Sequence, residues 1–378
     1  MIDQPVRITI IGRGLIGSAA ARHLAEAGHA VTLVGPLEGT TPGSHWDEGR
    51  ITRKNATDPF WSEVSTRAIA RYRELEAASG VRFFTETGAM MAGPAGDDFF
   101  RCALSTSSRH RDASQHLTFP VLRQRFPFFR FVAGTEALYE QQEAGHISPR
   151  ALVAAQTHLA EKSGARLVPA AATGFHMTAS VTTVTTTQGE IEGDQILVAT
   201  GGLTDHLLPG PLGLRVYART VALLEVSEDQ AIRLKEMPSL VFRQPDEAEP
   251  YLLPPIRYPD GRIYLKIGGD PVDHLLTTRA EIHDWFATDG NPRVRDHLEV
   301  LVRRLMPELE IRSVSSAACM TTFSHSGKPI IGRLGPRLTV ATAGNGAGAK
   351  CSDELGRLAA CALLDQPDSL LSETGVPS

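Results

Sequence analysis

The opening segment of the chain limits its possible folds more than any other part, because it sets a glycine-rich turn between an apolar strand and a helix. Residues 7–11, RITII, form a short apolar run that predicts a buried strand. Residues 18–27 are small and favour a helix, and Gly28 with His29 marks its end. Residues 30–34, AVTLV, predict the next strand. This order predicts a βαβ unit at the start of an α/β protein.

The turn reads GRGLIG, and its three glycines have separate physical roles. Gly12 permits the tight turn, Gly14 lets the backbone approach a pyrophosphate, and Gly17 lets the helix pack close to the strand. The pyrophosphate then lies at the positive end of the helix. Such a pattern alone is weak, but its place between a strand and a helix favours a dinucleotide site over an accidental glycine turn.

The residue that usually binds the adenosine ribose is missing. An acidic side chain is expected where the second strand ends, and that position is Gly35. Glu38 could reach the ribose from the following loop, or backbone groups could replace the side chain. This weakens an NAD interpretation, and the lack of a basic residue at the same place disfavours NADP. The ribose contact stays open.

Composition and charge narrow the classes of partner. The 378 residues include 38 Lys+Arg and 43 Asp+Glu, a net charge of −5, which gives no electrostatic reason to bind nucleic acid or anionic membrane. No apolar run is long enough for a transmembrane helix. The first residues, MIDQPVRITIIG, lack the features of a secretory signal. We therefore expect a cytoplasmic protein with no membrane contact.

Cysteines and histidines give no sign of a disulfide framework or a metal centre. The four cysteines are scattered, and no CxxC occurs. The 13 histidines show no HxxxH or HxH spacing, so no metal site is predicted.

Further along the chain, helical and strand patterns alternate without repeats or an obvious linker. Residues 60–80 have helical apolar spacing, and Ser148-Pro149 predicts the start of a helix ending near Gly164. Residues 181–188 and 194–202 predict strands. The length predicts two or three domains, and the mixed patterns between these elements indicate that two domains are interleaved.

Four segments, together with the order and length of the chain, carry a family resemblance. The chain resembles the glycine oxidase/D-amino-acid oxidase superfamily of flavoproteins, in particular its monomeric sarcosine oxidase and N-methyltryptophan oxidase branch. The segments are GRGLIG, GSHWDEGRITR at 43–53, DQILVATGG at 194–202, and the pair CMTTFSHSGKPIIG at 319–332 and AGNGAGAKCSDELG at 343–356.

The resemblance implies an α/β fold of two interleaved domains with the flavin between them. A Rossmann-like FAD-binding domain is expected from residues 1–80, 145–215 and 316–378. A substrate domain with a mixed or antiparallel sheet is expected from residues 81–144 and 216–315. FAD is the expected cofactor.

The segment 43–53 combines a glycine-flanked loop with two arginines. Ser44 and His45 can face a ligand from the loop, and the resemblance implies that this loop touches the flavin. Arg50 and Arg53 are three residues apart, about one helical turn, which indicates a shared face. Two arginines can bind an anion, although surface ion pairs are the plainer alternative. The resemblance implies that Arg50 lies at the flavin and that Arg53 holds a substrate carboxylate.

Two positions late in the chain complete the expected flavin site. Cys319 precedes a methionine, and the resemblance implies that it carries a covalent thioether to the flavin 8α carbon. We interpret Cys351 and Cys361 as structural residues. The small residues at 343–349, including Gly346 and Gly348, precede a helix expected to begin near Lys350. Such a loop brings backbone amides close to a ligand. The resemblance places this loop and Gly201 at the flavin, and makes Lys350 a second carboxylate ligand.

Lys266 lies in an alternating strand, RIYLKIGG, so its side chain faces away from the neighbouring apolar residues, and this could be a solvent face. The resemblance instead implies that Lys266 lies over the flavin and promotes the reaction with O₂, and that Tyr251 is in the active site. The family's pattern is broken at Trp46 and Asp270, where histidines are common, and at Thr321, where a tyrosine is common. The substrate is therefore expected to be larger or more polar than sarcosine.

The resemblance thus implies an FAD-dependent oxidase, expected as a monomer. Its substrate would be a small carboxylate-bearing secondary or cyclic amine, with O₂ as second substrate and an imine and H₂O₂ as products. One alternative is a dehydrogenase that passes electrons to another acceptor, and another is an NAD-binding or non-catalytic Rossmann protein. The sequence leaves the substrate, the electron acceptor and the oligomeric state open.

Overall fold

The computed structural model describes residues 5–36, 43–108, 114–243 and 249–376. The predicted βαβ unit is confirmed: strand β1 (Arg7–Ile11), helix α1 (Leu15–Glu26) and strand β2 (Ala30–Val34), with β1 and β2 parallel. The helix begins at Leu15 rather than at residue 18, because the last residues of the glycine turn already adopt helical geometry.

The first large sheet is built around β1. Within the described ranges it has six strands in the order β20-β21-β13-β1-β2-β9. The strands from β21 to β9 run parallel, and β20 is antiparallel at the edge. Its strands therefore come from three distant parts of the chain: besides β1 and β2 they are β9 (Arg166–Val168), β13 (Gln195–Val198), β20 (Ile330–Gly335) and β21 (Leu338–Thr342).

Helices cover one face of this sheet and form a core with it. Helix α1 packs against α6 (Pro149–Lys162) and α10 (Gly348–Leu363), and α10 also packs against α2 (Pro59–Ala70). Leu24 of α1 and Leu355 and Leu358 of α10 are fully buried in the shared core. Burial of such side chains contributes roughly 1.5–3 kcal/mol each. The predicted start of α6 is confirmed, since the Ser148 hydroxyl accepts a hydrogen bond from the Ala151 amide at 3.2 Å.

The second large sheet is mostly antiparallel and lies beside the first. Its order is β18-β14-β17-β16-β15-β5-β7-β6, and β19 pairs with β14, which makes nine strands among the described residues. Its members are β5 (Ala89–Pro94), β6 (Gln115–Leu117), β7 (Thr135–Glu140), β14 (Arg215–Val226), β15 (Ser239–Phe242), β16 (Tyr251–Arg257), β17 (Ile263–Gly268), β18 (His274–Leu276) and β19 (Ser313–Phe323).

Smaller elements complete the fold. Strands β3 (Arg50–Thr52), β8 (Gly145–Ile147) and β4 (Phe84–Thr85) form one small sheet, and β10 (Ala172–Met177), β11 (Thr182–Thr186) and β12 (Gly189–Gly193) form another. The remaining helices are α3 (Tyr72–Ser79), α4 (Asp98–Ser107), α5 (Phe119–Arg125), α7 (Glu228–Arg233), α8 (Arg279–Phe286) and α9 (Pro292–Leu305), with 3₁₀ helices η1 (Gly201–His206) and η2 (Ser369–Glu373).

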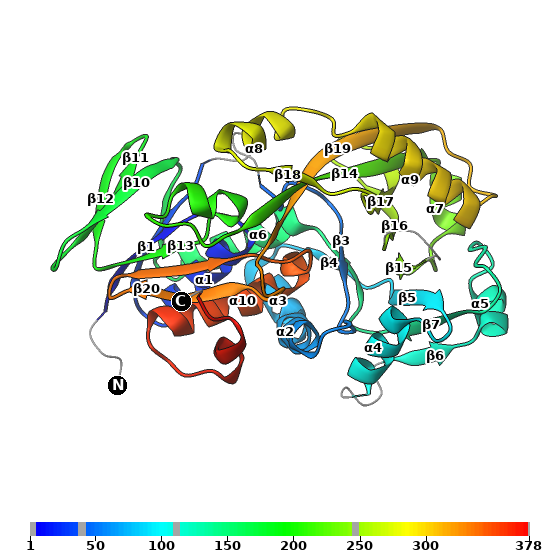
Figure 1. Cartoon of the computed structure of the whole chain (residues 1–378), viewed down its shortest axis with the longest axis horizontal. Coiled ribbons are helices and arrows are strands. Elements are labelled where there is room, and N and C mark those ends of the chain that lie inside the picture. Colours follow the sequence, from blue (N-terminus) through cyan, green and yellow to red (C-terminus); the bar gives the residue numbers. More distant parts are fainter. Residues whose placement is uncertain (1–4, 37–42, 109–113, 244–248, 377–378) are drawn as a thin grey trace.

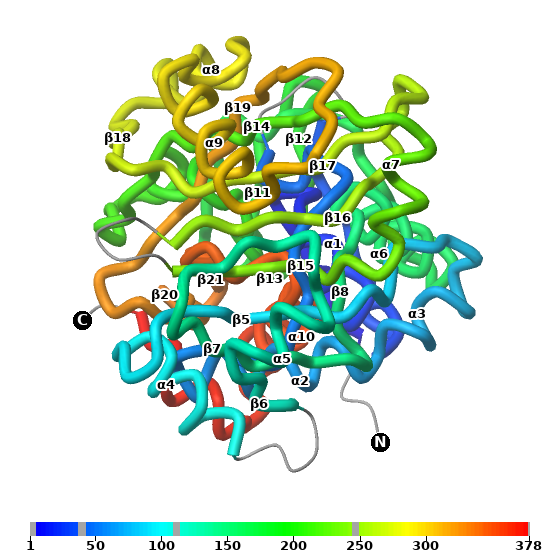
Figure 2. Tube along the Cα trace, turned by 90° about the vertical axis from the view of Figure 1, so that its right-hand side faces the viewer, coloured from blue at the N-terminus to red at the C-terminus, as the bar shows by residue number. Residues whose placement is uncertain are grey.

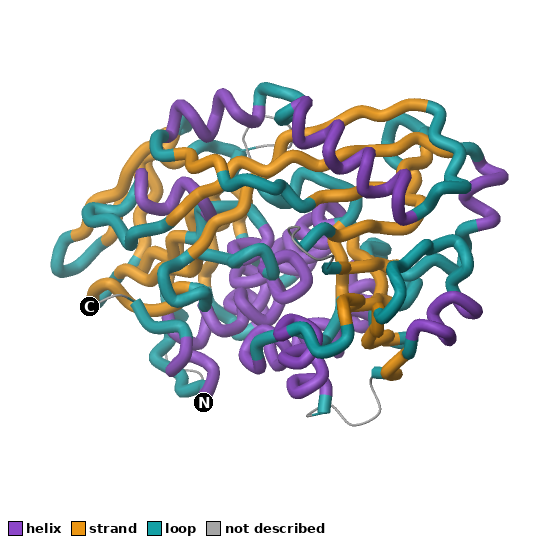
Figure 3. The backbone as a smooth tube through the Cα atoms, turned by 45° about the vertical axis from the view of Figure 1, so that its right-hand side comes forward, coloured by secondary structure: helices purple, strands orange, loops and turns teal. Residues whose placement is uncertain are grey.

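The molecule thus has two halves joined by long strands. In Figure 1 the β1 sheet lies to one side, the β5–β7 region to the other, and β14 and β19 run between them along the top. The same arrangement seen end-on shows β14, β17, β16 and β15 stacked in sequence above β5 and β7 (Figure 2). Figure 3 shows the helices of the first half gathered between the strands of the two halves. The expected α/β fold with a second, mostly antiparallel sheet is confirmed.

The helical interpretation of residues 60–80 is confirmed, and the segment is divided into two helices, α2 and α3, at Arg71. One local prediction was wrong. Arg50 and Arg53 do not share a helical turn, because Arg50 opens strand β3 and Arg53 follows its end; pairing with β8 holds this segment extended. The expected boundary at 315/316 falls inside β19, and the division into domains stays a prediction. Among the described helices, none is long and apolar enough to span a bilayer.

Candidate active site

A cavity of ≈ 820 Å³ lies where the two halves meet. One part of its wall comes from the β1–α1 turn and the start of α10, and the other part from the β14, β17 and β19 strands. The lining includes residues 11–16, 34–36, 43–46, 199–201, 219–221, 268–270, 319–323 and 342–350, with Arg50, Arg53 and Tyr251. Of the residues that the sequence singled out, Gly17 and Lys266 are not in this lining.

The β1–α1 turn requires glycine at two positions. Gly12 has a φ of 115°, and a Cβ there would lie 2.4 Å from the Ala199 carbonyl oxygen. A Cβ on Gly17 would lie 1.8 Å from the Gly12 oxygen, so the helix could not pack at this distance. Gly14 is the N-cap of α1, and no side chain caps the helix there. The first amides of α1 are therefore directed toward the cavity wall that the turn forms.

A second helix begins at the same cavity. Helix α10 starts at Gly348, its N-cap Ala347 provides no side-chain hydrogen bond, and Gly346 before it has a φ of 75°. Gly201 lines the cavity at the end of β13, with a φ of 57°. Two uncapped helix N-termini beside one cavity are suited to an anionic dinucleotide, since their free amides can donate hydrogen bonds to phosphate or carbonyl oxygens. The residues present therefore fit FAD.

The end of β2 explains why no acidic residue stands there. A Cβ on Gly35 would lie 2.4 Å from the Cβ of Arg13, so the arginine of the glycine turn occupies the space above this strand end. Arg13 donates a hydrogen bond to the Pro36 carbonyl at 3.0 Å and lines the cavity. Sequence reasoning expected no basic residue at this place and missed Arg13. Glu38, the other candidate for the ribose, lies outside the described residues.

The loop 43–49 and β3 bring Arg50 to Cys319. Arg50 Nη2 lies 3.3 Å from Cys319 Sγ and also donates to the Ser44 carbonyl at 2.9 Å. Ser44 Oγ donates to the Met320 carbonyl at 3.1 Å, which ties the loop to β19. The His45 pKa is lowered to about 4 by burial and nearby arginines, so its ring is neutral at pH 7. The predicted grouping of Ser44, His45, Arg50 and Cys319 is present along one cavity wall.

Arg53 and Lys350 reach the cavity from opposite ends of the sequence. Lys350 is 6% exposed, and no carboxylate of the described residues pairs with its ammonium. Its pKa is lowered to about 8, first by burial and also by the charge of Arg53. Burial lowers the pKa of Arg53 as well, and the charge of Glu140 opposes this. Arg53 and Lys350 thus place two positive charges in one cavity, with too little nearby negative charge to balance both. Such a pair can bind a carboxylate.

Hydrogen bonds hold the segments that carry Arg53 and Lys350 in place. The buried Glu140 accepts hydrogen bonds from the amides of Lys54 and Asn55 at 2.9 and 3.1 Å, and Arg53 donates to the Asn55 carbonyl. Tyr72 Oη donates to the Lys350 carbonyl at 2.6 Å.

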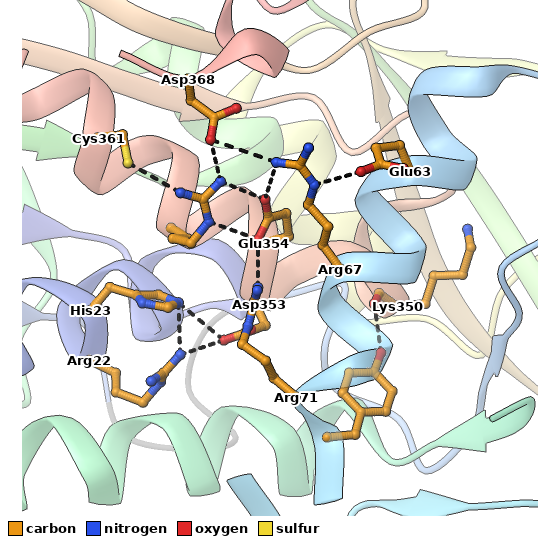
Figure 4. A network of polar contacts seen from close by, with 12 residues as sticks. Arg22, His23, Glu63, Arg67, Arg71, Lys350, Asp353, Glu354, Cys361 and Asp368 are labelled. Carbon is orange, nitrogen blue, oxygen red and sulfur yellow. Dashed lines mark hydrogen bonds and ion pairs between the residues drawn. The ribbon is translucent and has the colours of Figure 1, made fainter. Parts of the chain in front are cut away.

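Behind Lys350, a network of buried charges fixes helix α10. Asp353 pairs with Arg22 of α1 and with Arg71, and Glu354 pairs with Arg71 and Arg357. Burial would raise the pKa of Asp353, but His23, Arg71 and Arg22 outweigh burial and hold the pKa below its ordinary value. Figure 4 shows that the Lys350 side chain points away from this network. The network therefore anchors the helix and leaves the lysine available to the cavity.

Lys266 lies outside the lining and is fully buried, so the solvent-face alternative for it is wrong. Its ammonium contacts the carboxylate of Asp47 and donates to the Gly49 carbonyl at 2.6 Å. The Tyr251 ring, which does line the cavity, has its centroid 5.7 Å from Lys266 Nζ. Sequence reasoning missed Asp47, because a single acidic residue in a loop gives no pattern that reveals its distant partner.

The β14–β17 side of the cavity is polar. Arg219 lines it, pairs with Asp273 at 2.7 Å and donates to Thr321 Oγ1 at 3.1 Å. Asp270 accepts from the Thr220 amide at 3.1 Å, and its pKa is raised to about 6, chiefly by burial. The breaks in the family's pattern at Asp270 and Thr321 therefore both fall on the cavity wall.

Comparison with known families and proteins places these features in context. A family model described as FAD dependent oxidoreductase, DAO, matches residues 7–362. Monomeric sarcosine oxidase of Streptomyces avermitilis is 32% identical over 164 residues, which cover 42% of each chain. N-methyl-L-tryptophan oxidase of Yersinia pestis is 23% identical over 379 residues, 96% of each chain. The matches to three sarcosine oxidases span only 42%, 55% and 63% of those proteins.

Solved structures share the fold at low identity. A variant of NikD, described as an unusual amino acid oxidase essential for nikkomycin biosynthesis, has a TM-score of 0.82 at 21% identity, covering 100% of this chain and 98% of that one. Glycine oxidase of Geobacillus kaustophilus has a TM-score of 0.77 at 18% identity, with 98% and 99% coverage. L-proline dehydrogenase of P. horikoshii has a TM-score of 0.78 at 16% identity, with 98% and 96% coverage.

Proposed function

Because this chain belongs to the DAO family of FAD-dependent oxidoreductases, we propose that it oxidises the C–N bond of a secondary or cyclic amino acid. The observation that carries the proposal is that Arg53 and Lys350 line the same cavity as two uncapped helix N-termini, which suit a dinucleotide. The substrate would give up two electrons and two protons and leave as an imine. O₂ would take them up as H₂O₂.

We assign the cofactor to named parts of the cavity wall. The glycines of the β1–α1 turn and the amides of α1 would hold the pyrophosphate, and Ser44, His45, Arg50, Gly201, Gly346 and Gly348 would surround the rest of the FAD. When bound, the flavin supplies the two-electron redox chemistry between the amine and O₂. The chain itself binds, orients and shields the substrate.

The carboxylate of the substrate would bind between Arg53 and Lys350. Charge-assisted hydrogen bonds to both cations would fix its orientation and thereby that of the neighbouring C–N bond. The acidic and polar wall at Asp270 and Thr321 supports a substrate larger or more polar than sarcosine. Names of relatives support the same class: sarcosine and N-methyl-L-tryptophan both contain a secondary amine and a carboxylate.

We further propose that Cys319 attaches the flavin covalently. The Cys319 thiol is half-buried at the cavity wall, and Arg50 supplies a cation 3.3 Å from its sulfur. Attachment would join Sγ to the flavin 8α carbon and release two protons and two electrons, and O₂ would accept the electrons. The other described cysteines do not line the cavity.

Lys266 would serve the reaction with O₂ through its buried positive charge. The alternative is an amino acid dehydrogenase that passes electrons to another acceptor. The observation that favours this alternative is the position of Lys266 outside the cavity lining, since a cation behind the wall gives less help to O₂.

A cytoplasmic, monomeric protein remains the expectation. The four cysteines are free in the described structure, which supports a reducing compartment. Light scattering of the purified holoenzyme tests the monomer directly.

The proposal is tested by a peroxide assay with paired amines. N-methyl and cyclic amino acids are compared with the same amines in which a primary amide replaces the carboxylate. We expect H₂O₂ only from the carboxylates. Turnover with an artificial dye in place of O₂, without peroxide in air, would support the dehydrogenase alternative. A protein that stays colourless after incubation with FAD would refute both.

A further inference from the structure

The contacts of Lys266 point to a function for Asp47. The Lys266 side chain is 0% exposed, and it reaches from β17 across to the loop 43–49, where the Asp47 carboxylate and the Gly49 carbonyl accept from its ammonium. Within the described parts of the chain, Asp47 is the one carboxylate paired with this ammonium. We propose that Asp47 is the positioning residue that keeps Lys266 in its charged form beside the flavin site. This inference rests on the proposed role of Lys266 with O₂.

The groups around Lys266 explain why it needs this partner. The charge of Arg50 on β3 lowers the pKa of the ammonium. His146 on β8 is a buried neighbour, and Tyr251 on β16 presents its ring at 5.7 Å. The thiol of Cys319 on β19 is the remaining titratable neighbour. His146 is buried and its pKa is lowered to about 4, by burial and by the charge of Lys266, so it is neutral at pH 7. Asp47 therefore supplies the negative charge that balances two neighbouring cations.

Asp47 is held in place independently of Lys266. One carboxylate oxygen accepts from the Tyr258 hydroxyl at 3.0 Å and from the Glu48 amide at 2.7 Å, and the other contacts Arg50 and Lys266. Burial alone would raise the pKa of Asp47, but the charges of Lys266 and Arg50 outweigh it, so the group is ionised. The Asp47 carboxylate thus contacts both Arg50, which lies beside Cys319, and Lys266, to which we assign the role with O₂.

Removal of this carboxylate has a predictable electrostatic effect. The Lys266 pKa is lowered to about 8 by burial and by the charge of Arg50, with Asp47 opposing the shift. An unpaired buried ammonium releases its proton more readily. Without Asp47, Lys266 would become neutral at a lower pH than in the wild type. A reaction that depends on this positive charge would therefore slow first at alkaline pH.

The test uses Asp47→Asn holoenzyme reduced with dithionite and mixed with O₂ at pH 6 to 9. We expect reoxidation slower than wild type by about ten-fold or more at pH 8, with most of the rate recovered at pH 6. Lys266→Met should be slow at every pH. Asp47→Ser, which leaves room for water, gives the same result should the asparagine variant fail to fold. A wild-type pH profile in both Asp47 variants, or equal slowing at every pH, would overturn the inference.

Glu48→Gln is the matched control. It removes one negative charge from the adjacent residue, whose carboxylate accepts from Ser148 Oγ at 3.0 Å and lies 3.1 Å from Arg150 Nε. We expect it to keep the wild-type profile. A shift as large as that of the Asp47 variants would attribute the effect to net charge and overturn the inference.

A binding measurement separates this inference from the role of Lys266 in catalysis. Sulfite binds to oxidised flavin, and nearby positive charge strengthens this binding. Asp47→Asn should lose sulfite affinity between pH 6 and pH 8 more steeply than wild type does, because its Lys266 loses its charge over this range. If Lys266→Met reoxidises like wild type, the role proposed for Lys266 is wrong, and the sulfite affinities alone decide whether Asp47 maintains its charge. The same pH dependence of sulfite affinity in Asp47→Asn and in wild type would contradict that.

Discussion

The guanidinium of Arg50 lies against the thiol of Cys319, with 3.3 Å between Nη2 and Sγ. The two residues are far apart in sequence, and they meet because the loop 43–49 is tied to β19 through Ser44 and Met320. The Cys319 backbone is also fixed, since Trp285 Nε1 donates to its carbonyl at 2.7 Å. Arg50 and Trp285 thus hold Cys319 in one position at the cavity wall.

Cys319→Ser should abolish covalent flavin attachment without unfolding the protein. The serine hydroxyl is a far weaker nucleophile, while the glycine turn and the two helix N-termini that would hold FAD are unchanged. The measurement is the yellow colour that remains with acid-precipitated protein. Cys102→Ser, at an exposed position, is the control and should keep the colour. Covalent flavin in Cys319→Ser would disprove the assignment.

Gly35→Asp should weaken FAD binding, although it installs the acidic residue common at ribose sites. Its Cβ would lie 2.4 Å from the Cβ of Arg13 and would force one of them to move. Overpacking of this kind costs about 1–3 kcal/mol. The FAD dissociation constant is measured in the Cys319→Ser background, where binding is reversible. Adding Arg13→Gly, which removes the clashing Cβ, should restore part of the affinity in the double variant. Equal weakening with and without it would contradict the steric explanation.

Arg53→Gln and Lys350→Gln should each raise KM for a carboxylate-bearing amine by about ten-fold or more, because a charge-assisted hydrogen bond contributes about 1.5–3 kcal/mol. The amide analogue of the same amine should be affected much less. Steady-state kinetics with both compounds give the comparison, and Lys162→Gln at the exposed end of α6 is the control. Equal losses with the acid and the amide would mean that neither residue binds the carboxylate.

Lys350→Met should stabilise the apoprotein at pH 7. The folded-state pKa of Lys350 is lowered to about 8 from 10.5, chiefly by burial, so the charged lysine destabilises the fold below pH 8. This cost diminishes as pH rises through the folded pKa and vanishes above the unfolded one. Thermal unfolding should show a Tm higher by a few degrees at pH 7 and no gain near pH 11. A lower Tm at pH 7 would show that the buried charge is not a net cost.

The sequence alone predicted the parts of the site that lie in continuous motifs. The β1–α1 turn carries its function in the spacing of Gly12, Gly14 and Gly17, because local sterics set that spacing. The cavity residues Arg53, Cys319 and Lys350 could be named only through the family resemblance, since strand order, and not local pattern, brings them together.

Other features depend on contacts between distant segments, and no local sequence pattern predicts such contacts. Asp47 meets Lys266 across 219 positions, and Arg13 fills the space above Gly35 because α1 and β2 pack side by side. The helical interpretation of Arg50 and Arg53 failed for a related reason. A three-residue spacing fits a helical turn, but pairing of β3 with β8 decided the local structure.

The most direct test is anaerobic bleaching of the flavin by amines. Purified holoenzyme is mixed with N-methyl and cyclic amino acids in the absence of O₂, and the visible absorption of the flavin is followed. Air is then admitted, and the amount of H₂O₂ formed is measured. We predict that at least one carboxylate-bearing secondary or cyclic amine bleaches the flavin, and that air restores the colour with one H₂O₂ per flavin. No bleaching by any of these amines, in a protein that holds FAD, would contradict the proposed function.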